Sequence, residues 1–235
     1  GIAPRSGPDQ RIVWIETEAC MNFHVFNAFD DPSDPDQVIV YTCRQDASTG
    51  VGIGNLAGMR PASSPHGRRL QPDVALAHRW VLSCREARVV ESRRLEHEVL
   101  SENPCVNPKF VGRPHRFAYS TAYEDRLQRG QELGGEAVPE FTAVLKHDLR
   151  EGRVAARHAL EEGWTCGDVA FAPASRIRGG AEDEGSLLLL ALSPLGGPTA
   201  SCAELRVLDA RTLRPQAVVE IPMRVPAGTH CTYSP

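Results

Sequence analysis

Short apolar or alternating segments, each bounded by Gly, Pro, Asp or Asn, recur along the whole chain. Such segments are typical of β-strands, which favour Val, Ile, Tyr and Phe. The predicted strands are 11–16, 22–29, 37–43, 74–84, 116–123, 141–149, 154–160, 168–172, 186–192, 203–208 and 217–222. Helical spacing of apolar residues is hard to find over more than two turns, and the best helical candidate, 124–133, is short and polar. The pattern therefore predicts an all-β fold.

Two of these strands end near an aspartate and are followed at once by a returning strand. The first runs from Leu145 to Leu149 with Asp148 near its end, and the second runs from Leu205 to Ala210. Aspartate side chains accept backbone N–H groups in tight turns, so both segments predict β-hairpins. Outer strands of propeller blades end in this way, but so do ordinary hairpins. The residues alone therefore leave a sandwich, a barrel and a propeller open.

Composition and charge narrow the class of protein without identifying it. The chain has 235 residues, of which 41% are hydrophobic and 24% charged, as in a globular domain. Its longest apolar run, Leu187–Leu192, is too short to span a bilayer, although contact with a membrane surface stays open. The net charge is −4 and the basic residues are scattered, which argues against a nucleic-acid partner.

Seven cysteines are widely spaced, at positions 20, 43, 84, 105, 166, 202 and 231, and none forms a Cys-x-x-Cys pair. A disulfide framework or a zinc cluster would need closer pairing. Buried reduced thiols are the better interpretation. The expected location is an intracellular reducing compartment, either the cytoplasm or a plastid.

Two of the eight histidines stand apart from the rest. His24 lies in an apolar strand between Phe23 and Phe26, where a buried imidazole needs partners. His230 closely follows Gly228, which permits close approach of the backbone. The other six are in polar, turn or alternating settings and are expected to have no functional role: 66, 78, 97, 115, 147 and 158. No local histidine spacing indicates a metal site, so only the fold could bring His24 and His230 together.

Seven segments, taken in order, resemble motifs of the carotenoid cleavage oxygenase family. The segment from Phe23 to Asp31 resembles the family's FH..NA.E motif, and Val225 to His230 is similar to its terminal P.GFHG motif. The segments between them resemble EFP.IN, G...RY.Y, K.DL, GEP.FVP and EDDG, and they lie at 102–107, 112–119, 144–149, 167–173 and 182–185. The resemblance covers nearly the whole chain.

The resemblance implies a seven-bladed β-propeller with Fe(II) on its axis, held by four histidines. It maps His24 and His230 onto the third and fourth ligands. It maps Glu102 and Asp168 onto the carboxylates that accept the other ring N–H of His24 and His230 respectively. The first two ligands would lie upstream of Gly1. The chain is therefore expected to be the C-terminal part of a single propeller domain, roughly four blades, with no internal boundary.

The implied function is that of a non-haem iron(II) dioxygenase. Such an enzyme uses dioxygen to cleave a conjugated C=C bond of a carotenoid, apocarotenoid or related polyene into two carbonyl products. Imidazole nitrogen suits Fe(II) as a neutral ligand. With two of the four ligands, this chain alone is expected to be inactive.

Departures from the family pattern around His230 keep other readings open. Asp168 stands where the family has Glu, and Val169, Thr229 and Cys231 also differ from the motifs. The shorter Asp168 side chain is expected to fall short of the His230 ring. The alternative function is a metal-less propeller that acts as a binding or scaffold module. A third reading is an incomplete product that does not fold alone, because part of a propeller exposes unpaired strand edges.

Overall fold

The computed structural model describes residues 1–7, 11–46, 75–95, 101–123, 132–133, 136–137, 141–174, 180–193, 202–223, 225 and 230–234. These residues form antiparallel β-sheet with one short 3₁₀ helix, Pro108–Phe110. The strands are β1 (Cys20–Asp31), β2 (Asp34–Asp46), β3 (Leu76–Ser83), β4 (Arg88–Arg94), β5 (Ser101–Cys105), β6 (Phe117–Tyr123), β7 (Glu132–Leu133), β8 (Glu136–Ala137), β9 (Phe141–Asp148), β10 (Arg153–Ala159), β11 (Thr165–Pro173), β12 (Gly185–Leu192), β13 (Ala203–Asp209) and β14 (Pro215–Ile221). No helix in these ranges is long and apolar enough to cross a membrane.

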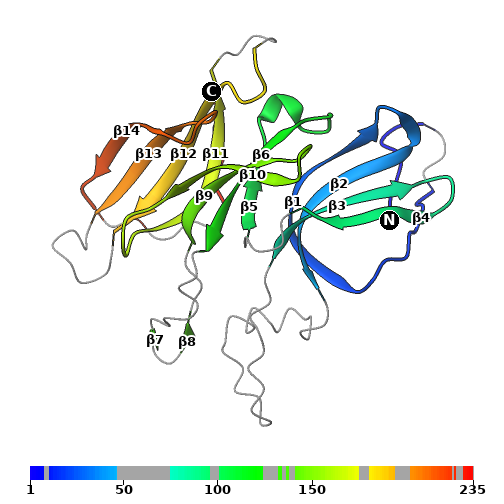
Figure 1. Cartoon of the computed structure of the whole chain (residues 1–235), viewed down its shortest axis with the longest axis horizontal. Helices are drawn as coiled ribbons and strands as arrows, with labels where there is room; N and C mark the ends of the chain where they lie inside the picture. The colour runs from blue at the N-terminus through cyan, green and yellow to red at the C-terminus, as the bar shows by residue number, and fades with distance from the viewer. Residues whose placement is uncertain are drawn as a thin grey trace.

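Most of the strands belong to three units of four antiparallel strands. The first unit is a separate sheet, β1-β2-β3-β4, the second is β5-β6-β9-β10, and the third is β11-β12-β13-β14. A pairing between Cys166 of β11 and Phe141 of β9 joins the second and third units into one larger sheet. The units lie side by side in a fan, and β5 contacts both β1 and β11 (Figure 1). The strands therefore have the layout of neighbouring propeller blades, and the four strands of each blade pair in chain order.

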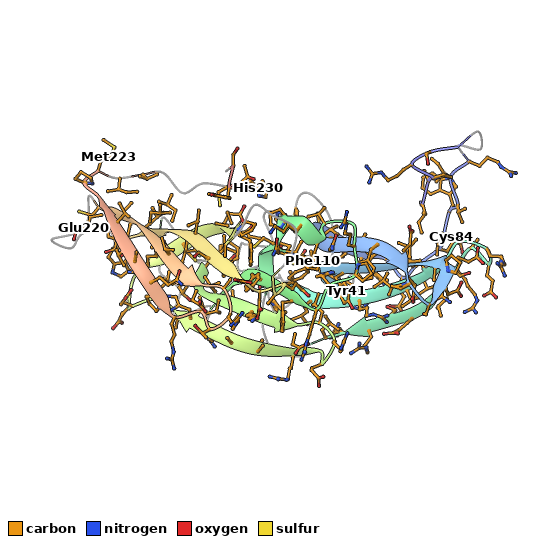
Figure 2. The ribbon with its side chains drawn as sticks, turned by 90° about the horizontal axis from the view of Figure 1, so that it is seen from above. Tyr41, Cys84, Phe110, Glu220, Met223 and His230 are labelled. Carbon is orange, nitrogen blue, oxygen red and sulfur yellow. The ribbon has the colours of Figure 1, made fainter. Side chains whose placement is uncertain are left out.

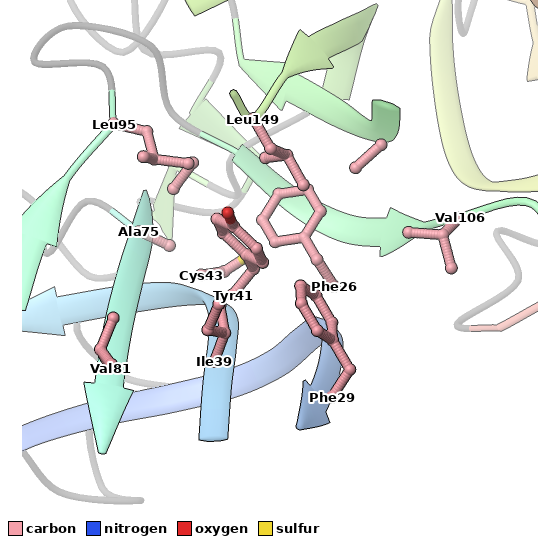
Figure 3. Packing of buried hydrophobic residues seen from close by; sticks show 12 residues of the cluster. Phe26, Phe29, Ile39, Tyr41, Cys43, Ala75, Val81, Leu95, Val106 and Leu149 are labelled. Carbon is pink, nitrogen blue, oxygen red and sulfur yellow. The ribbon is translucent and has the colours of Figure 1, made fainter. Parts of the chain in front are cut away.

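Apolar cores fill the spaces between neighbouring units. The core between the first and second units contains Phe26, Tyr41 and Cys43 packed with Ala118 and Leu149. Figure 3 shows the rings of Phe26 and Tyr41 close to Leu149. Burial of each large apolar side chain contributes about 1.5–3 kcal/mol. This packing holds the first and second units in place against one another.

A second core fills the third unit and its contact with the second. Its largest fully buried members include Tyr119 and Val144 of the second unit and Leu187 and Leu208 of the third. The Tyr119 hydroxyl donates to the Ala210 carbonyl at 2.9 Å, so the one polar atom of this ring is satisfied. The second and third units are therefore fixed by both packing and a buried hydrogen bond.

The all-β prediction is confirmed, and most predicted strands are present. Segment 11–16 is different, because among the described residues it makes only an isolated bridge between Val13 and Ile2. The charged strand β4 was not predicted. The helical candidate 124–133 lies mostly outside the described residues, and its last two positions form β7. The expected count of roughly four blades is not confirmed, since the described residues hold three four-stranded units.

Both predicted aspartate hairpins are confirmed. Asp148 ends β9, and its Oδ1 accepts the Glu151 N–H at 3.2 Å before β10 begins. Asp209 ends β13, and its Oδ1 accepts the Thr212 N–H at 2.8 Å before β14 begins. In each turn the carboxylate replaces a backbone acceptor, as the sequence pattern indicates.

Candidate metal centre

A β-bulge in β1 presents His24 at the junction with the second unit. Asn22 pairs with Arg44 and Val25 pairs with Thr42, so two residues of β1, at positions 23 and 24, face one residue of β2. A bulge of this kind bends the strand and redirects its side chains. The side chain of His24 reaches Glu102 on β5 as a result.

The two carboxylates of the site lie at similar irregularities. In β11, Gly167 and Asp168 face a single residue, Leu190, of β12. In β5 the register shifts directly after Glu102. There Asn103 takes a left-handed conformation with φ 49°, which Asn tolerates better than most residues. Bulges therefore occur at or next to His24, Glu102 and Asp168 in the first strands of all three units.

His24 and Glu102 form a short contact that is largely buried. Nδ1 of His24 lies 2.6 Å from Oε2 of Glu102, and the two side chains are 27% and 9% exposed. The hydrogen bond to Glu102 raises the pKa of His24, and the Glu102 charge adds to this, while burial opposes it. In the neutral ring, Nδ1 donates to the carboxylate and Nε2 is the acceptor atom.

His230 and Asp168 form a longer and more exposed contact. Nδ1 of His230 lies 3.3 Å from Oδ2 of Asp168, and the His230 side chain is 62% exposed. The same Oδ2 accepts the backbone N–H of Cys231 at 2.9 Å, and Oδ1 accepts that of Val169 at 3.0 Å. The expectation that Asp168 falls short of His230 is therefore wrong. Asp168 holds the backbone beside His230 as well as its ring, and residues 226–229 lie outside the described part.

The fold brings both pairs together. The rings of His24 and His230 have centroids 5.1 Å apart and planes at 79° to each other. Figure 2 shows His230 at one face of the fan of strands, the face that carries Phe110 of the 3₁₀ helix. Each ring has its Nδ1 directed to a carboxylate, which leaves Nε2 for a metal ion. Two neutral imidazoles fit a divalent transition metal, although the described residues contain no group of three or more His, Cys, Asp or Glu placed to hold one.

Two other histidines pack against aromatic rings or buried polar groups, His147 within a strand and His115 in the segment before β6. His147 is fully buried in β9, where Nε2 lies 2.8 Å from the Ser120 hydroxyl and the ring meets Phe26 edge-on. Nδ1 of His115 lies 3.2 Å from the Asn27 side-chain nitrogen, and burial lowers the pKa of His115 to about 4. The expected turn placement is therefore wrong for His147, whereas His115 does lie between a turn and the start of β6. His66 and His97 lie outside the described residues.

The remaining family-like motif residues hold the units together. The Asn27 side chain donates to the Phe110 carbonyl at 2.9 Å and accepts the Gly112 N–H at 2.9 Å, tying β1 to the 3₁₀ turn. Nζ of Lys146 donates to Asp183 at 2.6 Å, and both side chains are nearly buried. These contacts join segments that are distant in sequence, so a motif of this kind has a structural role.

Sequence reasoning assigned no contact with the two pairs to the residues that surround them. Cys43 lies across the bulge from His24, and the Cys231 N–H binds Asp168. Phe23 and Val25 flank His24 and are 43% and 53% exposed. Exposed apolar residues on both sides of a candidate ligand could have been recognised from the segment itself. The strand register that places Cys43 could not.

Comparison with known proteins assigns this arrangement to a family. The family described as retinal pigment epithelial membrane protein (RPE65) matches residues 1–235. A carotenoid cleavage oxygenase from Mycobacterium tuberculosis is 28% identical over 237 residues, covering 100% of this chain and 42% of the relative. An isoeugenol monooxygenase from Pseudomonas putida is 24% identical, covering 98% of this chain and 45% of the relative. The chain thus spans less than half the length of these relatives.

A solved structure supports the fold. The cobalt-substituted apocarotenoid oxygenase (ACO) from Synechocystis aligns with a TM-score of 0.70 at 23% identity, covering 97% of this chain and 42% of that one. The antiparallel strand units therefore belong to the propeller fold of that enzyme, as the sequence pattern and the motifs predict.

Proposed function

The chain belongs to the RPE65 and carotenoid cleavage oxygenase family, and we propose that the full-length protein is a non-haem iron(II) dioxygenase. It would use dioxygen to cleave a conjugated C=C bond of a carotenoid, apocarotenoid or related polyene into two carbonyl products. One observation carries this proposal: two histidines from distant segments lie ring to ring, each with a carboxylate at Nδ1.

In this proposal, His24 and His230 are iron ligands through Nε2. Imidazole nitrogen is a suitable ligand for Fe(II), and a carboxylate at Nδ1 fixes the tautomer and raises the basicity of the ring. The solved relative from Synechocystis is described as cobalt-substituted, which makes that protein a metalloprotein. Bound iron would supply the redox chemistry of dioxygen, which protein side chains do not provide. The remaining ligands would come from residues outside this chain.

The protein's own residues would orient the rings and receive the substrate. Glu102 and Asp168 hold His24 and His230 in place, as the hydrogen bonds above describe. Phe23 and Val25 expose apolar surface beside His24, which suits an apolar polyene. The carbonyl products are less apolar than the substrate at their new ends, so an apolar surface here would favour binding of the uncleaved polyene.

A second candidate function is a binding or scaffold module without metal. The observation that favours it is the exposure of His230, whose contact with Asp168 is longer than the contact of His24 with Glu102. A ring held this loosely would be a weak ligand. A direct test of substrate turnover distinguishes the two functions.

The test is product analysis with isotopically labelled dioxygen. The full-length protein, loaded with Fe(II), is incubated under ¹⁸O₂ with a carotenoid, an apocarotenoid and isoeugenol. We expect loss of conjugated absorbance with one of the polyenes, and mass spectra that show ¹⁸O in both carbonyl products. His24→Ala should abolish the products. A folded protein that retains no iron and turns over none of the three substrates would favour the scaffold function.

A further inference from the structure

We infer that Asn27 is a positioning residue for His24, because its side-chain amide holds the bulged part of β1 so that the His24 ring stays on Glu102. The inference rests on the proposed function, since the place of this ring affects chemistry only if His24 binds the metal. Asn27 itself touches neither the substrate nor the metal in this account.

The first observation is the irregular pairing of β1 around His24. Two bulges follow one another, so that between the pairs Asn22–Arg44 and Asn27–Tyr41 four residues of β1 face only two of β2. Each bulge leaves an extra residue unpaired and disrupts the ladder of backbone hydrogen bonds locally. Pairing with β2 therefore does not by itself fix where the His24 side chain points.

The second observation is the set of hydrogen bonds that the Asn27 amide makes directly after the second bulge. Its side chain is buried, and Nδ2 donates to the carbonyls of Phe110 and Arg113 at 2.9 and 3.3 Å. Its Oδ1 accepts the N–H groups of Gly112 and Ala28 at 2.9 and 3.0 Å. A side-chain amide has two N–H donors and two acceptor sites, so all four are used and the orientation of the amide is fixed.

The third observation is the place of the segment that Asn27 binds. Residues 110–113 follow closely after β5, the strand that carries Glu102. β1 is thus attached to one continuous stretch of chain at two places, through His24 at Glu102 and through Asn27 at 110–113. A single attachment would let the bulged part of β1 rotate about it, whereas a second attachment removes that freedom.

Asn107 provides a matched comparison at the other end of the same turn. It is as buried as Asn27, its Nδ2 donates to the Glu182 carbonyl at 2.8 Å, and its Oδ1 accepts the Lys109 N–H at 3.1 Å. These bonds tie the turn to the third unit, and neither of them reaches β1. Loss of the Asn107 amide should therefore destabilise the turn without releasing His24.

The direct test is the proton NMR resonance of the His24 ring N–H in the metal-free, full-length protein. A ring N–H that lies 2.6 Å from a carboxylate oxygen makes a strong hydrogen bond, which moves its resonance far downfield. The resonance is identified by its loss in His24→Gln. We expect Asn27→Ala to move it upfield and broaden it, and Asn107→Ala to leave it in place, although both variants lower the urea midpoint of unfolding. A resonance that Asn27→Ala leaves unchanged, or that both variants shift equally, would overturn the inference.

The functional test is a metal titration of the full-length protein. We expect Asn27→Ala to weaken Fe(II) binding about threefold to tenfold, less than the roughly 10–100-fold typical of losing a group bonded directly to a metal-binding His. Asn107→Ala should leave affinity unchanged. Equal weakening by the two variants would show a general effect of the turn and would overturn the positioning role.

A third variant separates hydrogen bonding from packing. Asn27→Asp keeps the size of the side chain and its acceptor oxygen, but it removes the donor to the Phe110 carbonyl. We expect it to weaken Fe(II) binding at least as much as Asn27→Ala. Wild-type affinity in Asn27→Asp would show that the side chain acts through packing alone, and would overturn the inference.

The NMR arm separates this inference from the proposed function. If the wild type binds no metal, the proposed function fails, while the His24 resonance still decides whether Asn27 holds this ring on Glu102.

Discussion

At the level of single residues, the two histidine–carboxylate pairs differ in how firmly they hold the ring. The His24 pair is short and mostly buried, whereas the His230 pair is longer and its ring is mostly exposed. Asp168 divides its hydrogen bonds between the ring and two backbone N–H groups. Part of its effect is therefore on the local backbone rather than on the ring.

This difference predicts unequal effects of removing the carboxylates. Loss of a partner that orients a metal-binding His typically costs about 10–100-fold in metal affinity. We expect Glu102→Ala to lie near the upper end of that range and Asp168→Ala near the lower end. The measurement is an Fe(II) titration of the full-length protein, with the exposed carboxylate variant Glu220→Ala as the control. A larger loss for Asp168→Ala than for Glu102→Ala would contradict this ranking.

At the level of elements, alternation of apolar residues identified strands but not their bulges. The strands that carry His24 and Asp168 were predicted close to their observed positions, because their residues favour sheet. The bulges depend on which residues pair across strands, and pairing is not visible in one segment alone. Strand β4 was missed because this outer strand, Arg88–Arg94, is largely charged and exposed. Segment 11–16 was predicted to be a strand because apolar and polar residues alternate there, but among the described residues it makes only an isolated bridge.

Gly185, at the start of β12, lies where there is no room for a side chain. A Cβ at Gly185 would lie 2.5 Å from the Ala172 carbonyl oxygen and 2.8 Å from the Phe171 ring. We expect Gly185→Ala to lower the free energy of unfolding by about 1–3 kcal/mol through overpacking between β11 and β12. Urea unfolding of the full-length protein measures this.

A second glycine gives the matched control. Gly112 has a φ of 72°, but a Cβ added there would meet nothing within 4 Å among the described residues. Gly112→Ala should therefore cost only the backbone strain, about 1 kcal/mol. The packing argument is wrong if Gly112→Ala destabilises the protein as much as Gly185→Ala.

At the level of the whole molecule, the order of motifs predicted the fold and the convergence of four distant residues. His24, Glu102, Asp168 and His230 lie together as the resemblance implies, while their metal roles stay a prediction. Which polar residues are buried between the units was not predictable from the motifs. His147 looks polar in sequence because Lys and Asp surround it, yet it is enclosed by the packing of the first two units. The reducing compartment also stays a prediction.

Buried neutral histidines predict how stability depends on pH. Burial, with a smaller contribution from the Arg44 charge, lowers the pKa of His78 to about 4, and this side chain is only 3% exposed. The unfolded chain, with a His pKa near 6.5, binds a proton that folded His78 rejects, so stability falls as pH drops from about 6.5 toward 4. We expect acidification from pH 7 to pH 5 to cost the wild type about 1–2 kcal/mol more than His78→Gln. Urea unfolding at both pH values checks this, and identical pH dependence of the two proteins would refute it.

The number of ligands predicts weak metal binding by residues 1–235 on their own. Two imidazoles cannot hold an ion as four can, and metal binding is coupled to a complete site. We expect these residues, expressed alone, to lose Fe(II) during gel filtration and to show no turnover. Stoichiometric iron that stays with the folded chain would show that residues 1–235 contain a complete site.

The central claim is that His24 and His230 bind one metal ion, and iron occupancy tests it most directly. The full-length wild type, His24→Ala, His230→Ala and the control His158→Ala are loaded anaerobically with Fe(II), desalted and analysed for iron. We predict about one iron per chain for the wild type and His158→Ala, and a large loss of iron for the other two while they remain folded. Equal iron retention by all four proteins would contradict the account.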